Sequence, residues 1–151
     1  MQTETKAKII QSRHFINGQF TDSQSLKTFQ NINPATEEVI GTVAEGGKEE
    51  VDFAVAAAKR ALDGPWKDYT LRERSALLRR IGDLILERID ELAYLESLDT
   101  GKPLSLAKKI DIPRAAYNFH FYADYMISIG NEAYQQDKDA FHYSYRHPVG
   151  V

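Results

Sequence analysis

An arginine, an amide and two aromatic side chains are placed at helical spacing between residues 114 and 125. Arg114 and Asn118 are four residues apart, and Phe121 and Tyr125 continue roughly the same helix face. A guanidinium group suits a planar carboxylate because it donates two parallel hydrogen bonds. This stripe therefore predicts a binding site for a carboxylate. The alternative is a surface arginine on a solvated helix face.

Other reactive side chains are scarce. The sequence contains no cysteine, which excludes disulfides, thiolate zinc sites and a thiolate nucleophile. Its nine glycines include no G-x-G-x-x-G arrangement for binding a dinucleotide phosphate. The histidines have no metal-ligand spacing, so we interpret them as structural or exposed. They are His14, His120, His142 and His147.

The overall composition narrows the class of protein. The chain has 151 residues, of which 42% are hydrophobic and 27% charged, and these proportions are typical of a globular domain. Its formal net charge of −3 gives no general attraction for nucleic acid or an anionic membrane, so neither is expected as a partner. No apolar run is long enough for a signal peptide or a membrane span. These features predict a cytoplasmic protein.

Short strands are expected first along the chain. Residues 1–13 are polar and predict a flexible tail, with structure beginning near His14. Asn17-Gly18 lies between two short apolar runs, a pattern that favours a β-hairpin with a type I′ turn. Extended segments are predicted at Leu26–Ile32 and Glu38–Val43. Such short strands need a common sheet to be stable.

Helical periodicity then replaces the strand pattern. One helix is expected from Gly47 to Gly64, with its apolar face including Val51 and Val55. A second begins at Thr70, where Thr70 and Glu73 have capping-box spacing, and continues to Gly101. A third is predicted over Pro113–Ile129.

The residues after Gly130 are expected to be extended. Phe141, Tyr143 and Tyr145 alternate with polar residues, as in a half-buried strand. The apolar segment 147–151 then predicts a strand cut off as it enters a core. We therefore expect this chain to be part of a larger unit.

Several segments, in their order and spacing from residue 14 to residue 151, resemble the start of the aldehyde dehydrogenase superfamily. They read FINGQF, NPATEEVIGTV, EEVDFAVAAAKRAL, LRERSALLRRIGDLI, LESLDTGKP and YRHPVGV. The resemblance implies an α/β fold, of which residues 14–151 form the N-terminal part of the NAD-binding and oligomerisation region. This part is expected to be mainly helical, with short β-hairpins and a truncated terminal strand.

The family mechanism implied by this resemblance needs residues beyond those present. A cysteine thiolate attacks the aldehyde, hydride passes to NAD or NADP, and water hydrolyses the thioester. Without a cysteine, the chain is expected to be inactive alone, and no cofactor is expected to bind it alone. The segment DIPRAAYNFHFYAD is most similar to hydroxymuconic and aminomuconic semialdehyde dehydrogenases, whose substrates carry carboxylates. The resemblance thus also assigns Arg114 and Asn118 to substrate binding.

A monovalent-cation site is a second implication of the resemblance. Family members often bind such an ion through oxygens at positions that match Asn31, Ile32 and Asp99. A hydroxyl residue is common where Asn31 stands, so the match is partial. The alternative for Asp99 is a helix-end residue hydrogen-bonded near Gly101.

Two functional hypotheses follow. The first is a piece of a semialdehyde-oxidising dehydrogenase whose partner is the missing C-terminal portion. By resemblance, the complete enzyme is a homo-oligomer, with the strand at residues 141–145 pairing between subunits. The second is a non-catalytic helical module that binds another protein, such as the C-terminal part of a split enzyme.

Overall fold

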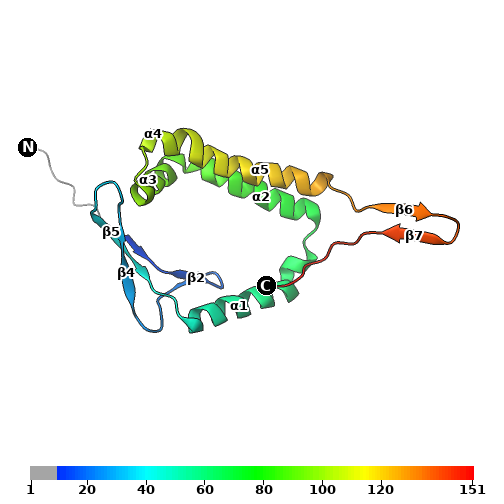
Figure 1. Cartoon of the computed structure of the whole chain (residues 1–151), viewed down its shortest axis with the longest axis horizontal. Helices are drawn as coiled ribbons and strands as arrows, with labels where there is room; N and C mark the ends of the chain where they lie inside the picture. Colours follow the sequence, from blue (N-terminus) through cyan, green and yellow to red (C-terminus); the bar gives the residue numbers. More distant parts are fainter. Residues whose placement is uncertain (1–9) are drawn as a thin grey trace, which may run out of the picture.

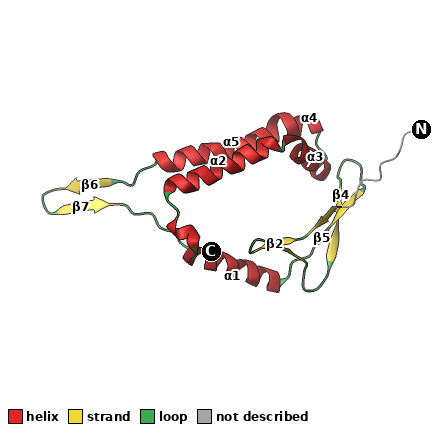
Figure 2. Cartoon of the chain, turned by 180° about the vertical axis from the view of Figure 1, so that it is seen from behind, coloured by secondary structure: helices red, strands yellow, loops and turns green. Residues whose placement is uncertain are grey.

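Two long helices dominate the computed structural model, which describes residues 10–151. Helices α2 (Leu71–Glu87) and α5 (Ile112–Ser128) lie side by side, as both cartoons show (Figures 1 and 2). A small sheet and helix α1 (Lys48–Asp63) lie apart from this pair, and a hairpin projects beyond the opposite end. The order of strands and helices agrees with an α/β arrangement that is mainly helical.

The sheet has three strands in the order β1-β5-β4. Strand β1 (Ile10–Ser12) pairs parallel to β5 (Val39–Ala44), and β4 (Thr28–Ile32) pairs antiparallel to β5. The close pairing depends on Gly41, because a Cβ there would lie 2.3 Å from the Ile10 carbonyl oxygen. The expectation of a flexible tail over residues 1–13 is therefore wrong for residues 10–12, which form a strand because they pair with β5. Residues 1–9 lie outside the described part of the chain.

The first hairpin has the predicted turn. Strands β2 (His14–Ile16) and β3 (Gln19–Thr21) are antiparallel. Asn17 and Gly18 join them with φ values of 54° and 77°, which are the positive values that a type I′ turn requires.

Helix α1 begins and ends where the sequence predicts. Its N-terminal turn is held by the buried Glu50, whose carboxylate accepts hydrogen bonds from the backbone N–H of Gln24 at 2.8 Å and of Gly47 at 2.6 Å. These bonds, that of Gln24 first, lower the pKa of Glu50 below its ordinary value of 4.5. Much of the expected apolar face remains uncovered, since Val51 is 59% exposed.

The long helix expected from Thr70 to Gly101 is divided in two. Thr70 and Glu73 make the predicted capping box, and Gly101 ends the second part in a left-handed conformation with φ of 73°. At Arg88 the backbone leaves helical geometry, with φ of −109° and ψ of 25°, so α3 (Ile89–Thr100) starts in a new direction. Periodicity missed the break because apolar residues continue across it.

The third predicted helix is found as α5, and further helical turns that were not predicted precede it. Helical geometry begins in α4 (Leu104–Leu106) and passes through a π-helical turn, η2 (Ala107–Asp111), before α5 starts. The predicted start at Pro113 is confirmed to within one residue, since α5 begins at Ile112, but the preceding π turn that accommodates Pro113 was not predicted.

Helices α2 and α5 approach closely because small residues line their contact. Gly82 lies against the His120 ring and the Ala116 backbone, and Ala116 and Ala123 are buried. The buried Ser75 hydroxyl donates a hydrogen bond of 2.7 Å to the Ala123 carbonyl across the pair. Close packing and polar bonds between the helices, among them those of Ser75 to Ala123 and of His120 to Asp83, thus fix α5, which carries the predicted carboxylate site.

The C-terminal region differs from its predicted form. Strand β6 (Ala133–Gln136), which we did not predict, pairs antiparallel with β7 (Ala140–Tyr143). Both strands are exposed rather than half-buried, because no layer of the described chain covers the hairpin. The predicted strand beyond Tyr143 is also wrong, including the truncated strand at residues 147–151: the segment 144–151 has no regular structure, and it lacks a neighbouring strand to bond with.

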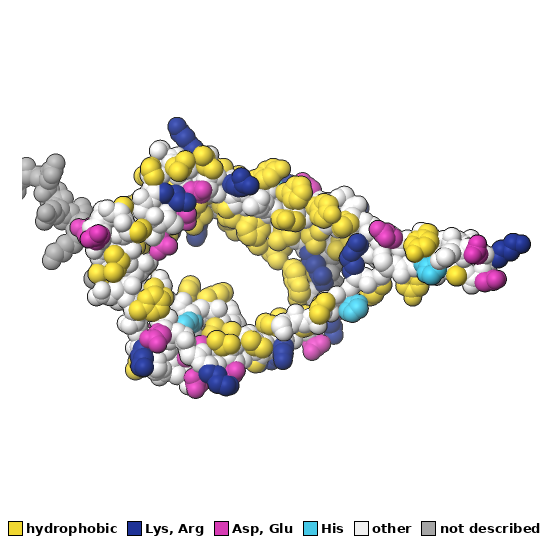
Figure 3. All heavy atoms as spheres, viewed as in Figure 1, with side chains coloured by type: hydrophobic (Ala, Val, Ile, Leu, Met, Phe, Trp, Pro, Cys, Tyr) yellow, Lys and Arg dark blue, Asp and Glu magenta, His cyan; other side chains and the backbone are white. Residues whose placement is uncertain are grey.

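Few residues are buried in the described chain. The buried hydrophobic residues are Ile40, Ala44, Ala93, Ala107, Ile112, Ala116 and Ala123. Figure 3 shows an opening through the middle of the molecule, with hydrophobic side chains on the helices that border it. Within residues 10–151, no helix combines the length and apolar character needed to cross a membrane.

Candidate functional site

The predicted arginine and amide meet in a shallow pocket at the start of α5. This pocket has a volume of about 470 Å³. Its lining residues are Lys109, Ile110, Pro113, Arg114, Tyr117 and Asn118. The structure thus brings Arg114 and Asn118 together, as their spacing of four residues on α5 requires.

The Arg114 side chain is available to a ligand. It is exposed, and it makes no hydrogen bond or ion pair with any other residue between 10 and 151. No carboxylate lines its pocket, whereas both a lysine and an arginine do. Such a surface favours a negatively charged group, which the guanidinium can bind through two hydrogen bonds.

The two aromatic residues of the predicted stripe lie further along the helix. Phe121 and Tyr125 stack with ring centroids 5.9 Å apart and planes inclined by 9°. Tyr117 lies 6.2 Å from Phe121 and also lines the pocket, so it connects the aromatic row to Arg114. Tyr117 was not predicted as a site residue, although its spacing of four residues from Phe121 would have indicated it.

Lys109, which also lines the pocket, was not predicted from the sequence either. Its distance of five residues from Arg114 places the two on different faces of a regular α-helix, about 140° apart around the axis. The π turn that precedes α5 changes this relation.

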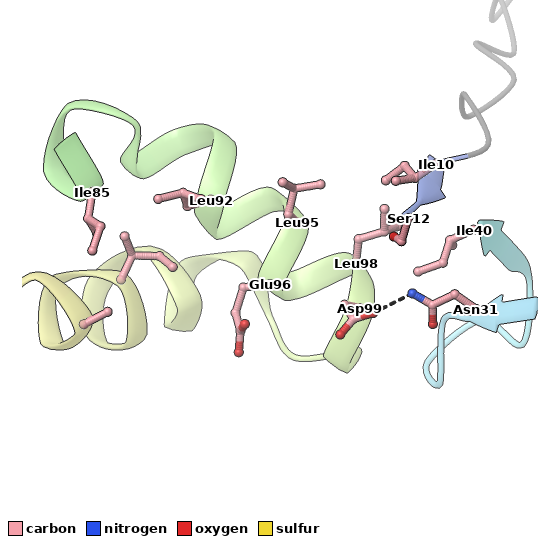
Figure 4. A pocket seen from close by; sticks show the side chains of 12 residues that line it. Ile10, Ser12, Asn31, Ile40, Ile85, Leu92, Leu95, Glu96, Leu98 and Asp99 are labelled. Atoms are coloured by element: carbon pink, nitrogen blue, oxygen red, sulfur yellow. Dashed lines mark hydrogen bonds between the residues drawn. The ribbon is translucent and has the colours of Figure 1, made fainter. Parts of the chain in front are cut away.

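Two of the three residues of the predicted cation site, Asn31 and Asp99, line a second pocket of about 530 Å³ (Figure 4). Asn31 on β4 faces Asp99 at the end of α3, and its Nδ2 donates a hydrogen bond of 2.7 Å to Asp99 Oδ1. Ile32 follows on the strand, at a point where the pairing register shifts, but does not line the pocket. In this arrangement the amide presents a donor to the carboxylate, whereas a cation requires oxygen ligands. The cation site stays a prediction.

An ion-pair network fixes the chain between the two pockets. Lys102 Nζ lies 2.8 Å from a carboxylate oxygen of Asp111 and 2.8 Å from one of Glu96. These hydrogen bonds, that to Asp111 first, raise the pKa of Lys102 above its ordinary value of 10.5. The ammonium group thereby ties α3 to the π turn that precedes Arg114.

The four histidines lie on four different segments of the structure. His120 Nε2 is 3.0 Å from Asp83 Oδ1 between α5 and α2, and His14 packs against Gly46. His142 stacks on Tyr134 in the hairpin. In residues 10–151, no three His, Asp or Glu side chains gather closely enough to hold a metal ion.

Known proteins resemble this chain in both sequence and structure. The model of the aldehyde dehydrogenase family matches residues 20–151. A 2-hydroxymuconic semialdehyde dehydrogenase of Pseudomonas sp. (strain CF600) is 47% identical over 143 residues, and a 2-aminomuconic semialdehyde dehydrogenase of Bos taurus is 39% identical over 144 residues. These matches cover 92% and 95% of the chain, respectively.

A solved structure gives the same assignment. An NAD+ complex of an aldehyde dehydrogenase from Bacillus cereus superimposes with a TM-score of 0.87 at 40% identity, over 93% of this chain. The chain spans about 29% of the length of each of these three proteins. The family model, the identities and the superposition agree, and the chain belongs to the aldehyde dehydrogenase family.

Proposed function

We propose that this chain is the N-terminal part of an NAD(P)-dependent dehydrogenase that oxidises a carboxylate-bearing semialdehyde to the corresponding acid. The relatives named for muconic semialdehydes support this substrate class. The observation that carries the proposal is the pocket where the exposed Arg114 and Asn118 meet without an acidic neighbour. A semialdehyde with a carboxylate at its far end fits such a pocket, because the guanidinium orients that end.

Catalysis depends on the remainder of the enzyme in this proposal. The chain has no cysteine, so another segment must supply the nucleophile that attacks the aldehyde carbon. The residues present do not fit a dinucleotide, since the sequence has no glycine-rich phosphate loop. The nicotinamide cofactor, which accepts hydride when bound, would be held by that other segment. The contribution of this chain is to position the substrate.

The exposed apolar side chains of α1 and α5 suggest where the rest of the enzyme packs against this chain. Val51 and Phe53 on α1 are 59% and 56% exposed, and Phe121 and Tyr125 on α5 are 46% and 48% exposed. Burial of such side chains contributes about 25 cal/mol per Å², so a covering layer would stabilise the chain strongly. We propose that the rest of the enzyme covers these faces.

The same surface also favours the second candidate, a non-catalytic module that binds a separate protein. The two functions differ in what the bound partner does. In the first, the partner carries the cysteine and oxidises the aldehyde. In the second, the complex forms without aldehyde oxidation.

Contacts between subunits belong to the proposal as well. In the β6–β7 hairpin, all eight strand residues are exposed, and Phe141 and Tyr143 are 66% and 74% exposed. An uncovered strand edge offers free backbone groups to another chain. We therefore propose that β7 pairs with a second subunit in the complete homo-oligomer.

The test is NAD-dependent oxidation of 2-hydroxymuconic semialdehyde, followed as NADH formation. The 151-residue chain is assayed alone, the complete enzyme is assayed in parallel, and an Arg114→Met variant of the complete enzyme is compared with it. We expect activity only from the complete enzyme and a higher KM in the variant. The proposal would be contradicted if the complete enzyme did not oxidise this semialdehyde, or if the KM of the variant were unchanged.

A further inference from the structure

A π-helical turn precedes Arg114, and Pro113 explains its presence. In an α-helix, the backbone N–H of residue 113 would bond to the carbonyl of Lys109, but proline has no N–H, and its ring collides with that carbonyl. The chain instead widens by one residue: the Ile112 N–H bonds to the Ala107 carbonyl, five residues earlier. Turns of this kind often occur at functional sites.

The widened turn changes which side chains share a face. A π turn places residues five apart above one another, whereas an α-helix separates them. Lys109 and Arg114 are five residues apart, and both line the same pocket with Tyr117. A continuous α-helix would direct the Lys109 side chain elsewhere.

Some of the positively charged side chains near this pocket form ion pairs, and others do not. Lys102 is paired with Glu96 and Asp111, and Lys108 is paired with Asp90. By contrast, no acidic partner for Lys109 or Arg114 is found among residues 10–151. The two cations that line the pocket therefore have no counterion among residues 10–151.

We propose that Lys109 is a second specificity-determining residue, which acts with Arg114 to bind the carboxylate end of the semialdehyde. This inference rests on the proposed function and deepens it. Two cations around one carboxylate select acids over neutral aldehydes of the same length, because a neutral end group gains nothing from the positive field. The exposed face of Tyr117 lies beside them and suits a flat, conjugated chain. The substrate class is then a conjugated aldehyde that ends in a carboxylate.

The experiment compares two substrates in the complete enzyme. The kcat/KM for 2-hydroxymuconic semialdehyde is divided by the kcat/KM for hexa-2,4-dienal, a conjugated aldehyde without the acid. We expect this ratio to fall about tenfold in Lys109→Met, as for loss of one charged hydrogen bond, and to recover largely in Lys109→Arg. Inhibition by sorbate should weaken by a similar factor. Lys108→Met is the matched control, since its lysine is already paired, and it should keep the ratio.

The possible outcomes distinguish a failure of the inference about Lys109 from a failure of the proposed function. If Lys109→Met keeps the ratio while Arg114→Met lowers it, Lys109 has no part in selection, and the proposed function stands. If Lys108→Met lowers the ratio as much as Lys109→Met, general surface charge explains the effect, and the inference is overturned. If the wild-type complete enzyme does not oxidise the semialdehyde, the proposed function fails, and the inference fails with it.

Discussion

The contact between α2 and α5 leaves no room for a side chain at Gly82. A Cβ there would lie 2.5 Å from both Cδ2 and Nε2 of His120, and 3.1 Å from the Ala116 carbonyl oxygen. The His120 ring can move only by giving up its bond to Asp83, and the carbonyl belongs to the backbone of α5. Overpacking of this kind costs about 1–3 kcal/mol, while alanine gains up to about 1 kcal/mol over glycine in helix propensity. Gly82→Ala should therefore lower the free energy of unfolding by up to about 2 kcal/mol.

Urea unfolding followed by circular dichroism measures this change in the purified chain. The control is the double variant Gly82→Ala/His120→Ala, which removes the ring that the new Cβ meets. Relative to His120→Ala alone, the added methyl group should be nearly neutral or stabilising. If Gly82→Ala by itself raises the free energy of unfolding, the two helices are not packed as closely as described, and the reasoning is refuted.

Four further changes test the local structure by the same unfolding measurement. Ser75→Ala should lower the free energy of unfolding by about 1 kcal/mol, because the Ala123 carbonyl loses a buried partner; an unchanged midpoint would contradict that bond. Thr70→Ala should cost about 1 kcal/mol through loss of the helix cap, with Thr70→Ser as the conservative control that keeps most of it. Because the pKa of Glu50 is lowered, its contribution to the free energy of unfolding is complete above pH 4.5 and is lost as the pH falls below that value. Glu50→Gln should therefore weaken the dependence of unfolding on acid pH. An identical pH profile would refute this assignment. Lys102, with its raised pKa, acts in the opposite sense: its contribution is complete below pH 10.5 and lost as the pH rises above that value, and Lys102→Met should flatten this alkaline loss.

Local signals predicted the elements that depend on nearby residues. The turn at Asn17-Gly18, the cap at Thr70 and the stop at Gly101 each rest on interactions within a few residues, so the sequence alone reveals them. Arg114 and Asn118 were found together for the same reason, since their relation is set within one helix.

Other features depend on neighbours distant in the chain. Strand β1 forms because it pairs with β5, and the sequence of residues 10–12 does not indicate that partner. The half-buried strand expected near Phe141 relied on a covering layer that the described chain does not contain. The break at Arg88 and the π turn at Ala107–Asp111 leave the apolar pattern intact, so periodicity could not reveal them. Lys109 was missed as a consequence of that turn.

Aldehyde oxidation by the chain with and without the remaining polypeptide tests the central claim most directly. Purified 151-residue chain, the remaining polypeptide and their mixture are each supplied with NAD and 2-hydroxymuconic semialdehyde, and NADH formation is recorded at 340 nm. We predict no NADH from the 151-residue chain, which has no cysteine to attack the aldehyde, and sustained NADH formation from the mixture. NADH formed by the 151-residue chain alone, or a mixture that binds but does not oxidise the aldehyde, would contradict the account.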